Sequence, residues 1–128
     1  MQQVCTKCFL YRSMNIQDEQ RPWGSFRRFT LNEPSTVKLV SINAGKQLSL
    51  QYHNDREEFW RILDGNPTII IGDSEVIASV GDEFFVPKKT NHRIRANDQN
   101  VRILELAFGS FDEADIVRLE DSYGRASA

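Results

Sequence analysis

Hydrophobic and polar residues alternate in short runs from Trp23 onward, and turn-forming residues separate these runs. A series of short alternating runs with turn signals between them favours an all-β barrel or sandwich. The runs that predict strands are 25–31, 37–42, 48–53, 59–63, 68–71, 75–80, 83–86, 92–96 and 101–108. No helical period of convincing length appears before the last twenty residues. Residues 111–119 fit either a short helix or an extended segment.

Successive side chains of a strand point to opposite faces, so residues two apart share a face. The sets that share a predicted interior face are Ser49, Gln51 and His53, then Glu58, Trp60 and Ile62, then His92, Ile94 and Ala96. Leu48, Leu50 and Tyr52 would then face the other way. An apolar strip of this kind needs a cover, which is the second sheet, the N-terminal segment or another subunit. We expect a homodimer.

Composition limits the classes of function. A chain of 128 residues is long enough for one domain with a single core. The net charge of −2, with both signs mixed along the chain, gives no footprint for nucleic acid. No apolar run approaches the roughly 20 residues of a membrane span, and the N-terminus lacks the apolar region of a secretory signal. We therefore expect a cytoplasmic protein that binds neither nucleic acid nor membranes.

Cys5 and Cys8 form a lone C-x-x-C near the N-terminus. A redox motif of this type needs a strand before it and a helix after it, and a zinc site needs a second ligand pair. Neither context is present in the sequence. We interpret the two cysteines as free thiols.

The only two histidines of the chain lie in two spaced motifs. His53 lies in Gly45-x5-Gln51-x-His53-x4-Glu58-x6-Gly65, and His92 lies in Gly81-x5-Pro87-x4-His92. Two imidazoles, a carboxylate and an amide oxygen suit one divalent metal ion such as Mn, Fe, Co, Ni or Zn. Gln51 and His53 project to one side of a strand, and Glu58 is expected on the adjoining strand. The alternative is a barrel that has lost useful affinity, because an amide oxygen is a weaker ligand than imidazole.

This two-part spacing resembles the cupin signature, and three further segments make the resemblance specific. Residues 21–26, 48–60 and 115–125 are similar to the cupin domain of type II mannose-6-phosphate isomerases. The resemblance implies a double-stranded β-helix, or jelly-roll barrel, over residues 21–125. Residues 1–20 would form an N-terminal strap and 126–128 a tail. The metal motif of that family begins with glutamine, which implies Gln51, His53, Glu58 and His92 as the ligands.

Several positions depart from the family pattern. In the family, further histidines usually follow the first one, and the motif ends in His-Trp. Here Asn54, Asp55 and Phe59 replace these residues, and Lys89 stands where the second motif commonly has glycine. These changes leave the four ligands intact and alter the wall of the pocket.

The resemblance implies a metal-dependent isomerase that interconverts mannose 6-phosphate and fructose 6-phosphate. The reaction moves a proton between C2 and C1, and a base must carry it. Because both histidines are assigned to the metal, the candidates for this base are Glu57 and Lys89. A phosphate group needs cations, and arginine suits it by bidentate geometry. The candidates for the hexose phosphate are Arg56, Lys46, Lys89, Arg21 and Arg125.

Two other functions use the same residues. His53, Glu58 and His92 without Gln51 form the 2-His-1-carboxylate set of non-haem Fe(II) oxygenases. A non-catalytic cupin that binds sugar phosphates would need only the pocket. Ligand identity does not separate these alternatives from the isomerase.

Overall fold

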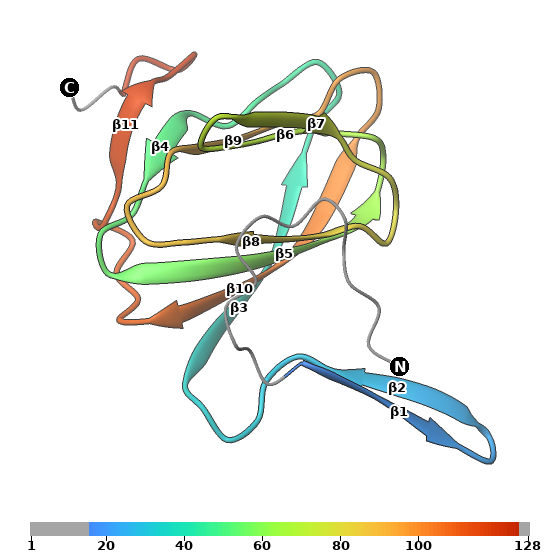
Figure 1. Cartoon of the computed structure of the whole chain (residues 1–128). Coiled ribbons are helices and arrows are strands. Elements are labelled where there is room, and N and C mark those ends of the chain that lie inside the picture. Colours follow the sequence, from blue (N-terminus) through green and yellow to red (C-terminus); the bar gives the residue numbers. More distant parts are fainter. Residues whose placement is uncertain (1–15, 126–128) are drawn as a thin grey trace.

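The computed structural model describes residues 16–125, and every regular element in this part of the chain is a β-strand. This confirms the predicted all-β fold. The strands are β1 (Gln17–Arg21), β2 (Gly24–Arg28), β3 (Ser35–Ile42), β4 (Leu50–Tyr52), β5 (Arg56–Asp64), β6 (Thr68–Ile71), β7 (Ser74–Ile77), β8 (Glu83–Val86), β9 (His92–Arg95), β10 (Val101–Gly109) and β11 (Val117–Glu120). Figure 1 shows them as a barrel with one hairpin extending from it.

The barrel consists of two antiparallel sheets that face each other. One sheet has the strand order β3-β10-β5-β8, and the other has the order β11-β4-β9-β6-β7. The chain crosses repeatedly from one sheet to the other, as in a jelly roll. Consequently β4 and β5 lie in different sheets. The expectation that Glu58 lies on a strand adjoining that of Gln51 is wrong, because the turn at residues 53–55 carries the chain across the barrel.

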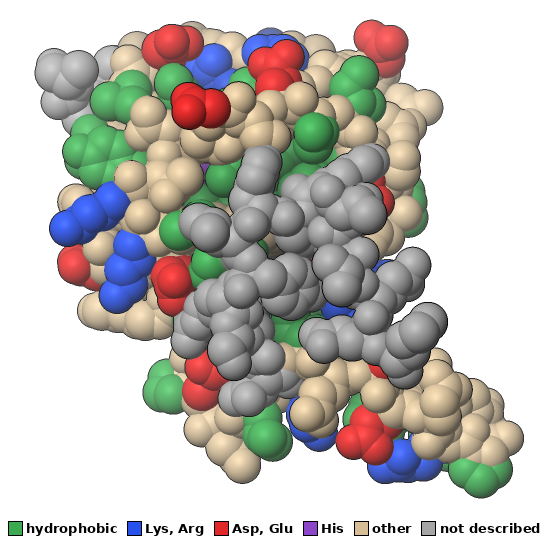
Figure 2. Space-filling model, viewed as in Figure 1, with side chains coloured by type: hydrophobic (Ala, Val, Ile, Leu, Met, Phe, Trp, Pro, Cys, Tyr) green, Lys and Arg blue, Asp and Glu red, His purple; other side chains and the backbone are tan. Residues whose placement is uncertain are grey.

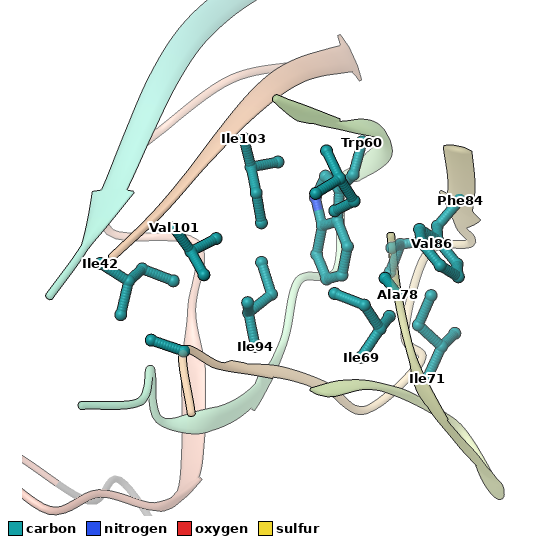
Figure 3. Packing of buried hydrophobic residues seen from close by; sticks show 12 residues of the cluster. Ile42, Trp60, Ile69, Ile71, Ala78, Phe84, Val86, Ile94, Val101 and Ile103 are labelled. Carbon is teal, nitrogen blue, oxygen red and sulfur yellow. The ribbon is translucent and has the colours of Figure 1, made fainter. Parts of the chain in front are cut away.

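The core lies between the two sheets. Figure 3 shows Trp60 and Ile103 of the four-stranded sheet pointing toward Ile69 and Ile94 of the five-stranded sheet. These four side chains are almost fully buried. The predicted alternation is therefore confirmed for the strands that carry Trp60 and Ile94.

A second apolar cluster covers the outer face of the four-stranded sheet. Its buried members are Ile16, Phe59, Leu106 and Phe108. Both faces of β5 and β10 are covered in part, so neighbouring residues of opposite faces are buried together, as Phe59 and Trp60 are in β5 and Leu106 and Ala107 are in β10. This explains why strict alternation is weak in their sequence.

The hairpin of β1 and β2 is attached to the barrel through Arg27. Its guanidinium donates two hydrogen bonds to Glu83 of β8, at 3.0 and 2.6 Å. All of β1 except Arg21 falls within the segment predicted as an N-terminal strap, where the sequence pattern indicated no strand. Its sequence, Gln-Asp-Glu-Gln-Arg, has no apolar residue, and its strand conformation comes from pairing with β2.

The structure decides between the two alternatives for residues 111–119. They contain no helix but form turns that lead into the extended strand β11, which pairs with β4. One further expectation needs correction. Leu48 does not face away from the barrel but packs against the core cluster. The ladder is interrupted between the isolated bridge at Gln47 and the start of β4, so the alternation is lost there.

The face of the molecule in Figure 2 carries no large field of one sign among its described residues. On the face in Figure 2, acidic and basic side chains are interspersed among polar and apolar ones. Within residues 16–125, no helix is long and apolar enough to cross a membrane. Cys5, Cys8 and the predicted tail at 126–128 lie outside the described residues.

Candidate metal centre

Three predicted ligands meet inside the barrel. His53 follows β4, Glu58 lies in β5, and His92 begins β9. One donor atom from each lies within 4.8 Å of the others, and all three side chains are buried. The two histidines and the glutamate therefore come from facing sheets, and they close one end of the core.

Backbone carbonyls set the tautomers of both imidazoles. The carbonyl of Asp115 lies 2.7 Å from Nδ1 of His53, and the carbonyl of Thr90 lies 2.9 Å from Nδ1 of His92. A carbonyl oxygen only accepts hydrogen bonds, so each Nδ1 must carry the proton. Each Nε2 then presents a lone pair toward Glu58, which is the arrangement that a metal-binding histidine needs.

Burial and charge keep the imidazoles neutral and Glu58 ionised. Burial lowers the pKa of His92 to about 4, and burial also lowers the pKa of His53. For Glu58, burial alone would raise the pKa, but the histidines and the Arg56 guanidinium hold it below the ordinary value. At neutral pH the cluster thus offers two neutral nitrogen donors and one carboxylate.

This donor set fits a divalent metal ion. Nε2 of His92 is buried and has no hydrogen-bond partner among the described residues. A buried polar atom without a partner is costly, and a bound cation would satisfy it. Two imidazoles and a carboxylate suit Mn, Fe, Co, Ni or Zn.

Gln51 lies beside this group. It pairs with His92 across β4 and β9, so both side chains face the barrel interior. Its Oε1 accepts a hydrogen bond of 2.6 Å from the hydroxyl of Ser49. The second lone pair of that oxygen is available for a cation.

Arg56 also reaches into the ligand group, and its side chain is buried. Nε donates to Oε2 of Glu58 at 3.0 Å, and one terminal nitrogen lies 3.2 Å from Nε2 of His53. The other terminal nitrogen donates to the carbonyl of Asp112 at 3.2 Å. Of the five cations predicted for the hexose phosphate, Arg56 is thus engaged with the metal ligands.

The other four predicted cations are spread over the molecule. Lys89 lies in the loop before β9, and its amide donates to the carbonyl of His53 at 2.7 Å. Lys46 lines a separate pocket of about 390 Å³ with Arg95 and Tyr123. The structure does not bring Lys46 into the ligand group, because its pocket lies on the outer face of the five-stranded sheet.

The two remaining cations are paired with carboxylates. Arg21 lies on the hairpin and pairs with Glu19 at 2.9 Å. Arg125 pairs with Asp121 at 3.0 Å and lies over the ring of Tyr123. Neither contacts a histidine of the ligand group.

Of the two candidate bases, Glu57 lies on the outer face of β5, opposite Phe108 of the outer apolar cluster. Lys89 is exposed at the end of the barrel where the ligands lie. The four-stranded sheet therefore lies between the two candidate bases, Glu57 and Lys89.

The sequence pattern did not predict Arg118, which shares the interior face with two of the ligands. It pairs with Gln51, which in turn pairs with His92, so the three side chains lie in a row across β11, β4 and β9. Within the part of the chain described, the side chain of Arg118 has neither a hydrogen bond nor an ion pair. Its place in the resembling segment 115–125 was the only signal in the sequence.

Glu105 is the second residue that the sequence pattern did not predict. It lies in β10 opposite Trp60 and is buried behind Glu58. Burial, together with the charge of Glu58, raises the pKa of Glu105 to about 7. The sequence did carry a signal for this residue. Glu105 is the one charged residue at alternate positions that otherwise hold Val101, Ile103 and Ala107.

Comparison with known proteins places these residues in a family. The chain matches the family described as mannose-6-phosphate isomerase C-terminal over residues 12–121. Alginate biosynthesis protein AlgA of Pseudomonas aeruginosa is 34% identical over 118 residues, which make up 90% of this chain and 24% of AlgA. Xanthan biosynthesis protein XanB of Xanthomonas campestris pv. campestris is 32% identical over 107 residues, or 82% of this chain and 23% of XanB. The chain spans about a quarter of the length of these curated relatives.

Solved structures show the same fold at low sequence identity. A dTDP-6-deoxy-D-glucose-3,5-epimerase of Legionella pneumophila has a TM-score of 0.61 at 12% identity and covers 81% of this chain and 69% of its own. A cupin protein of Bacteroides fragilis has a TM-score of 0.54 at 22% identity, with 59% of this chain and 66% of its own covered. The likeness predicted from the sequence is confirmed, and the chain belongs to the mannose-6-phosphate isomerase C-terminal family of cupin domains.

Proposed function

We propose that this chain is a metal-dependent aldose–ketose isomerase that interconverts mannose 6-phosphate and fructose 6-phosphate. The observation that supports this most is the His53–Glu58–His92 group with Arg118 on the same interior face, an arginine whose side chain has no partner among residues 16–125, in a chain of this family. The arrangement offers a site for a cation and a site for an anion within one barrel.

His53, Glu58 and His92 would hold the metal ion, and Gln51 would be the fourth ligand. A bound divalent ion supplies Lewis-acid polarisation of the sugar oxygens at C1 and C2. The carbonyls of Asp115 and Thr90 hold the two imidazoles in the tautomer that leaves each Nε2 free for coordination.

Arg118 would bind the phosphate group. Neighbouring strands are about 4.8 Å apart, so its backbone is roughly 10 Å from that of His92. An extended hexose phosphate separates its reacting carbons from its phosphate on this scale. A guanidinium that no carboxylate of the described residues contacts is also well suited to a bidentate phosphate contact.

The proton carried between C2 and C1 needs a group on the substrate side of the barrel. Of the two candidates, Glu57 faces the outer apolar cluster and Lys89 lies at the ligand end. Lys89 is therefore the better candidate for this role.

A coupled assay with both sugar phosphates tests the proposal. The chain is stripped of metal, reconstituted with Mn²⁺, Co²⁺ or Zn²⁺, and assayed in both directions. We expect turnover that depends on metal. Arg118→Met should raise KM at least about tenfold while metal content is unchanged, since one charge-assisted contact is lost. The control is Arg102→Met, because Arg102 is exposed on β10 and pairs with Asp64.

Absence of turnover with every metal would overturn the isomerase. Oxygen uptake that depends on iron would instead identify an oxygenase. A thermal shift with sugar phosphate but no turnover would identify a binding domain.

A further inference from the structure

All three nitrogens of the Arg56 guanidinium are engaged. They contact Oε2 of Glu58, Nε2 of His53 and the carbonyl of Asp112. The face of the same group lies 4.5 Å from the ring centroid of Phe111. Arg56 thus joins two metal ligands to the segment between β10 and β11, which we call the cover segment (residues 110–116).

The contact between Arg56 and His53 is incompatible with a metal on His53. Since Nδ1 of His53 carries the proton, Nε2 has one lone pair. That lone pair accepts a hydrogen bond from Arg56 or binds a cation, but it does not do both. A second positive charge next to the guanidinium also adds repulsion in a buried site.

The cover segment makes two different kinds of contact with the ligand group. The carbonyl of Asp115 accepts the Nδ1 proton of His53, and its carboxylate accepts the amides of Asn54 and Asp55, each at 2.9 Å. These contacts are compatible with a metal, because they leave Nε2 of His53 free. The contacts of Phe111 and Asp112 pass through Arg56 and are not independent of it.

Lys38 provides a further attachment of the cover segment. Its ammonium lies 4.6 Å from the ring centroid of Phe111 and donates to Glu113 at 2.6 Å. Phe111 therefore contacts two cations, one of which is bound to the metal ligands. Among the described residues, Lys38 and Asp115 still hold the cover segment when the Arg56 contact is lost.

We propose that Arg56 is a positioning residue that couples metal binding to the cover segment. A metal on His53 displaces the guanidinium, and Phe111 and Asp112 lose the contacts that hold them over the ligand end of the barrel. Asp115 stays in place and keeps His53 oriented. The inference rests on the metal centre of the proposed function, but it does not depend on the sugar reaction.

The coupling works in both directions, because linkage between two sites is reciprocal. If metal binding releases residues 111–112, the attached segment must weaken metal binding by the same factor. Removal of the guanidinium should therefore tighten metal binding and detach the segment at once.

Hydrogen exchange of the wild-type chain is the first test. The amides of Ala114 and Asp115 bond to Asp112, so peptides over residues 110–116 report on the segment. Zn²⁺ should increase exchange there and leave exchange in β5 and β10 unchanged. Unchanged or slower exchange in this segment, with Zn²⁺ bound, would overturn the inference. A chain that binds no Zn²⁺ would overturn both the inference and the metal centre.

A variant tests the role of the guanidinium itself. Arg56→Met keeps an unbranched buried side chain and removes every donor. It should bind Co²⁺ at least about fivefold more tightly than the wild type in a chelator competition, which is the low end of typical coupling. Its cover segment should exchange rapidly with or without metal. The control is Arg61→Met, which lies on the same strand but pairs with Glu83 on the outer side.

Weaker Co²⁺ binding by Arg56→Met, in protein that circular dichroism shows to be folded, would overturn the proposed displacement. Arg56→Lys provides a second variant with the charge kept. One ammonium does not reproduce the planar fork that contacts Glu58, His53 and Asp112 together. It should therefore release the cover segment as Arg56→Met does, while its affinity for Co²⁺ lies between those of Arg56→Met and the wild type.

Discussion

Lys89 adopts a backbone conformation that favours glycine. Its φ is 58°, in the left-handed region, and its amide bonds to the carbonyl of His53. The sequence showed that lysine replaces a glycine common in the family at this position. The structure gives the physical meaning of that replacement, which is a strained residue in the loop that leads to His92.

Lys89→Gly should stabilise the fold by about 0.5 kcal/mol. Glycine relieves a left-handed cost of roughly 1–2 kcal/mol, but it loses part of this gain through the entropy of the unfolded chain. Urea unfolding measures the difference. Lys88→Gly is the control and should lower the free energy of unfolding, because the φ of Lys88 is not positive. Lower stability of Lys89→Gly than of Lys88→Gly would contradict the argument.

Glu58 is the residue on which both the metal and Arg56 depend. Glu58→Gln removes the negative charge between His53, His92 and Arg56. Metal affinity should fall at least about 100-fold, and the fold should lose about 3 kcal/mol because a buried guanidinium loses its counter-ion. Metal content and urea unfolding test the two effects. Glu57→Gln, on the outer face of β5, is the control and should leave metal affinity unchanged.

At the scale of elements, an ion pair between Arg27 and Glu83 joins the hairpin of β1 and β2 to the barrel. Arg27 contacts Glu83 and Asp18, and its side chain is 18% exposed. Arg27→Met should leave the hairpin paired within itself but less firmly attached. We expect faster cleavage near residues 22–24 in limited proteolysis and a loss of about 1–2 kcal/mol in the free energy of unfolding. An unchanged cleavage rate would show that other contacts hold the hairpin.

At the same scale, β5 explains much of the site. Arg56, Glu58 and Trp60 alternate along its interior face. One strand therefore supplies the buried guanidinium, the carboxylate and an indole that donates to that carboxylate. The indole nitrogen of Trp60 donates to Oε1 of Glu58 at 3.0 Å. Glu58 is thereby oriented by two neighbours on its own strand before any metal is bound.

At the scale of the whole molecule, pH changes the stability of the fold through two buried groups, and the two effects have opposite signs. The pKa of His92 falls from 6.5 to about 4 on folding, so its contribution to stability is present above pH 6.5 and is lost as pH falls toward 4. The pKa of Glu105 rises from 4.5 to about 7, so its contribution is fully present below pH 4.5 and is lost as pH rises through 7.

Glu105→Gln isolates the second contribution, because an amide can donate to Glu58 at every pH. As pH rises from about 5 to about 8, the unfolding free energy of the variant should increase by about 2 kcal/mol relative to that of the wild type. Urea unfolding of metal-free protein at several pH values measures this. A difference between variant and wild type that does not change with pH would show that Glu105 is not protonated in the native state.

The homodimer expected from the sequence stays a prediction, and we expect it to use a different surface. Leu48 packs into the core, whereas Val37 and Leu39 are 60% and 56% exposed on β3, at the edge of the four-stranded sheet. We propose that a second copy covers these residues. Sedimentation should show a dimer that Leu39→Glu dissociates, while Val80→Glu, at an exposed turn, does not. A monomeric wild-type chain would refute the proposal.

Much of the barrel and of the candidate metal centre could be predicted from the sequence alone. Strand faces follow from a period of two, and the order Gln51, His53, Glu58 and His92 follows from the spacing of the two motifs. These are local properties, since each depends on residues close together in the chain. The family resemblance has the same basis and is confirmed.

Tertiary structure decided which distant strands face one another, and this determined the rest of the site. Only the crossing between sheets places Glu58 opposite the histidines, and only the pairing of β11 with β4 places Arg118 beside Gln51. The sequence carries no local signal for either pairing, because contacts between distant strands depend on the packing of the whole core. For the same reason Arg56 was predicted as a phosphate ligand from its position in the motif, whereas the folded barrel buries it against Glu58 and His53.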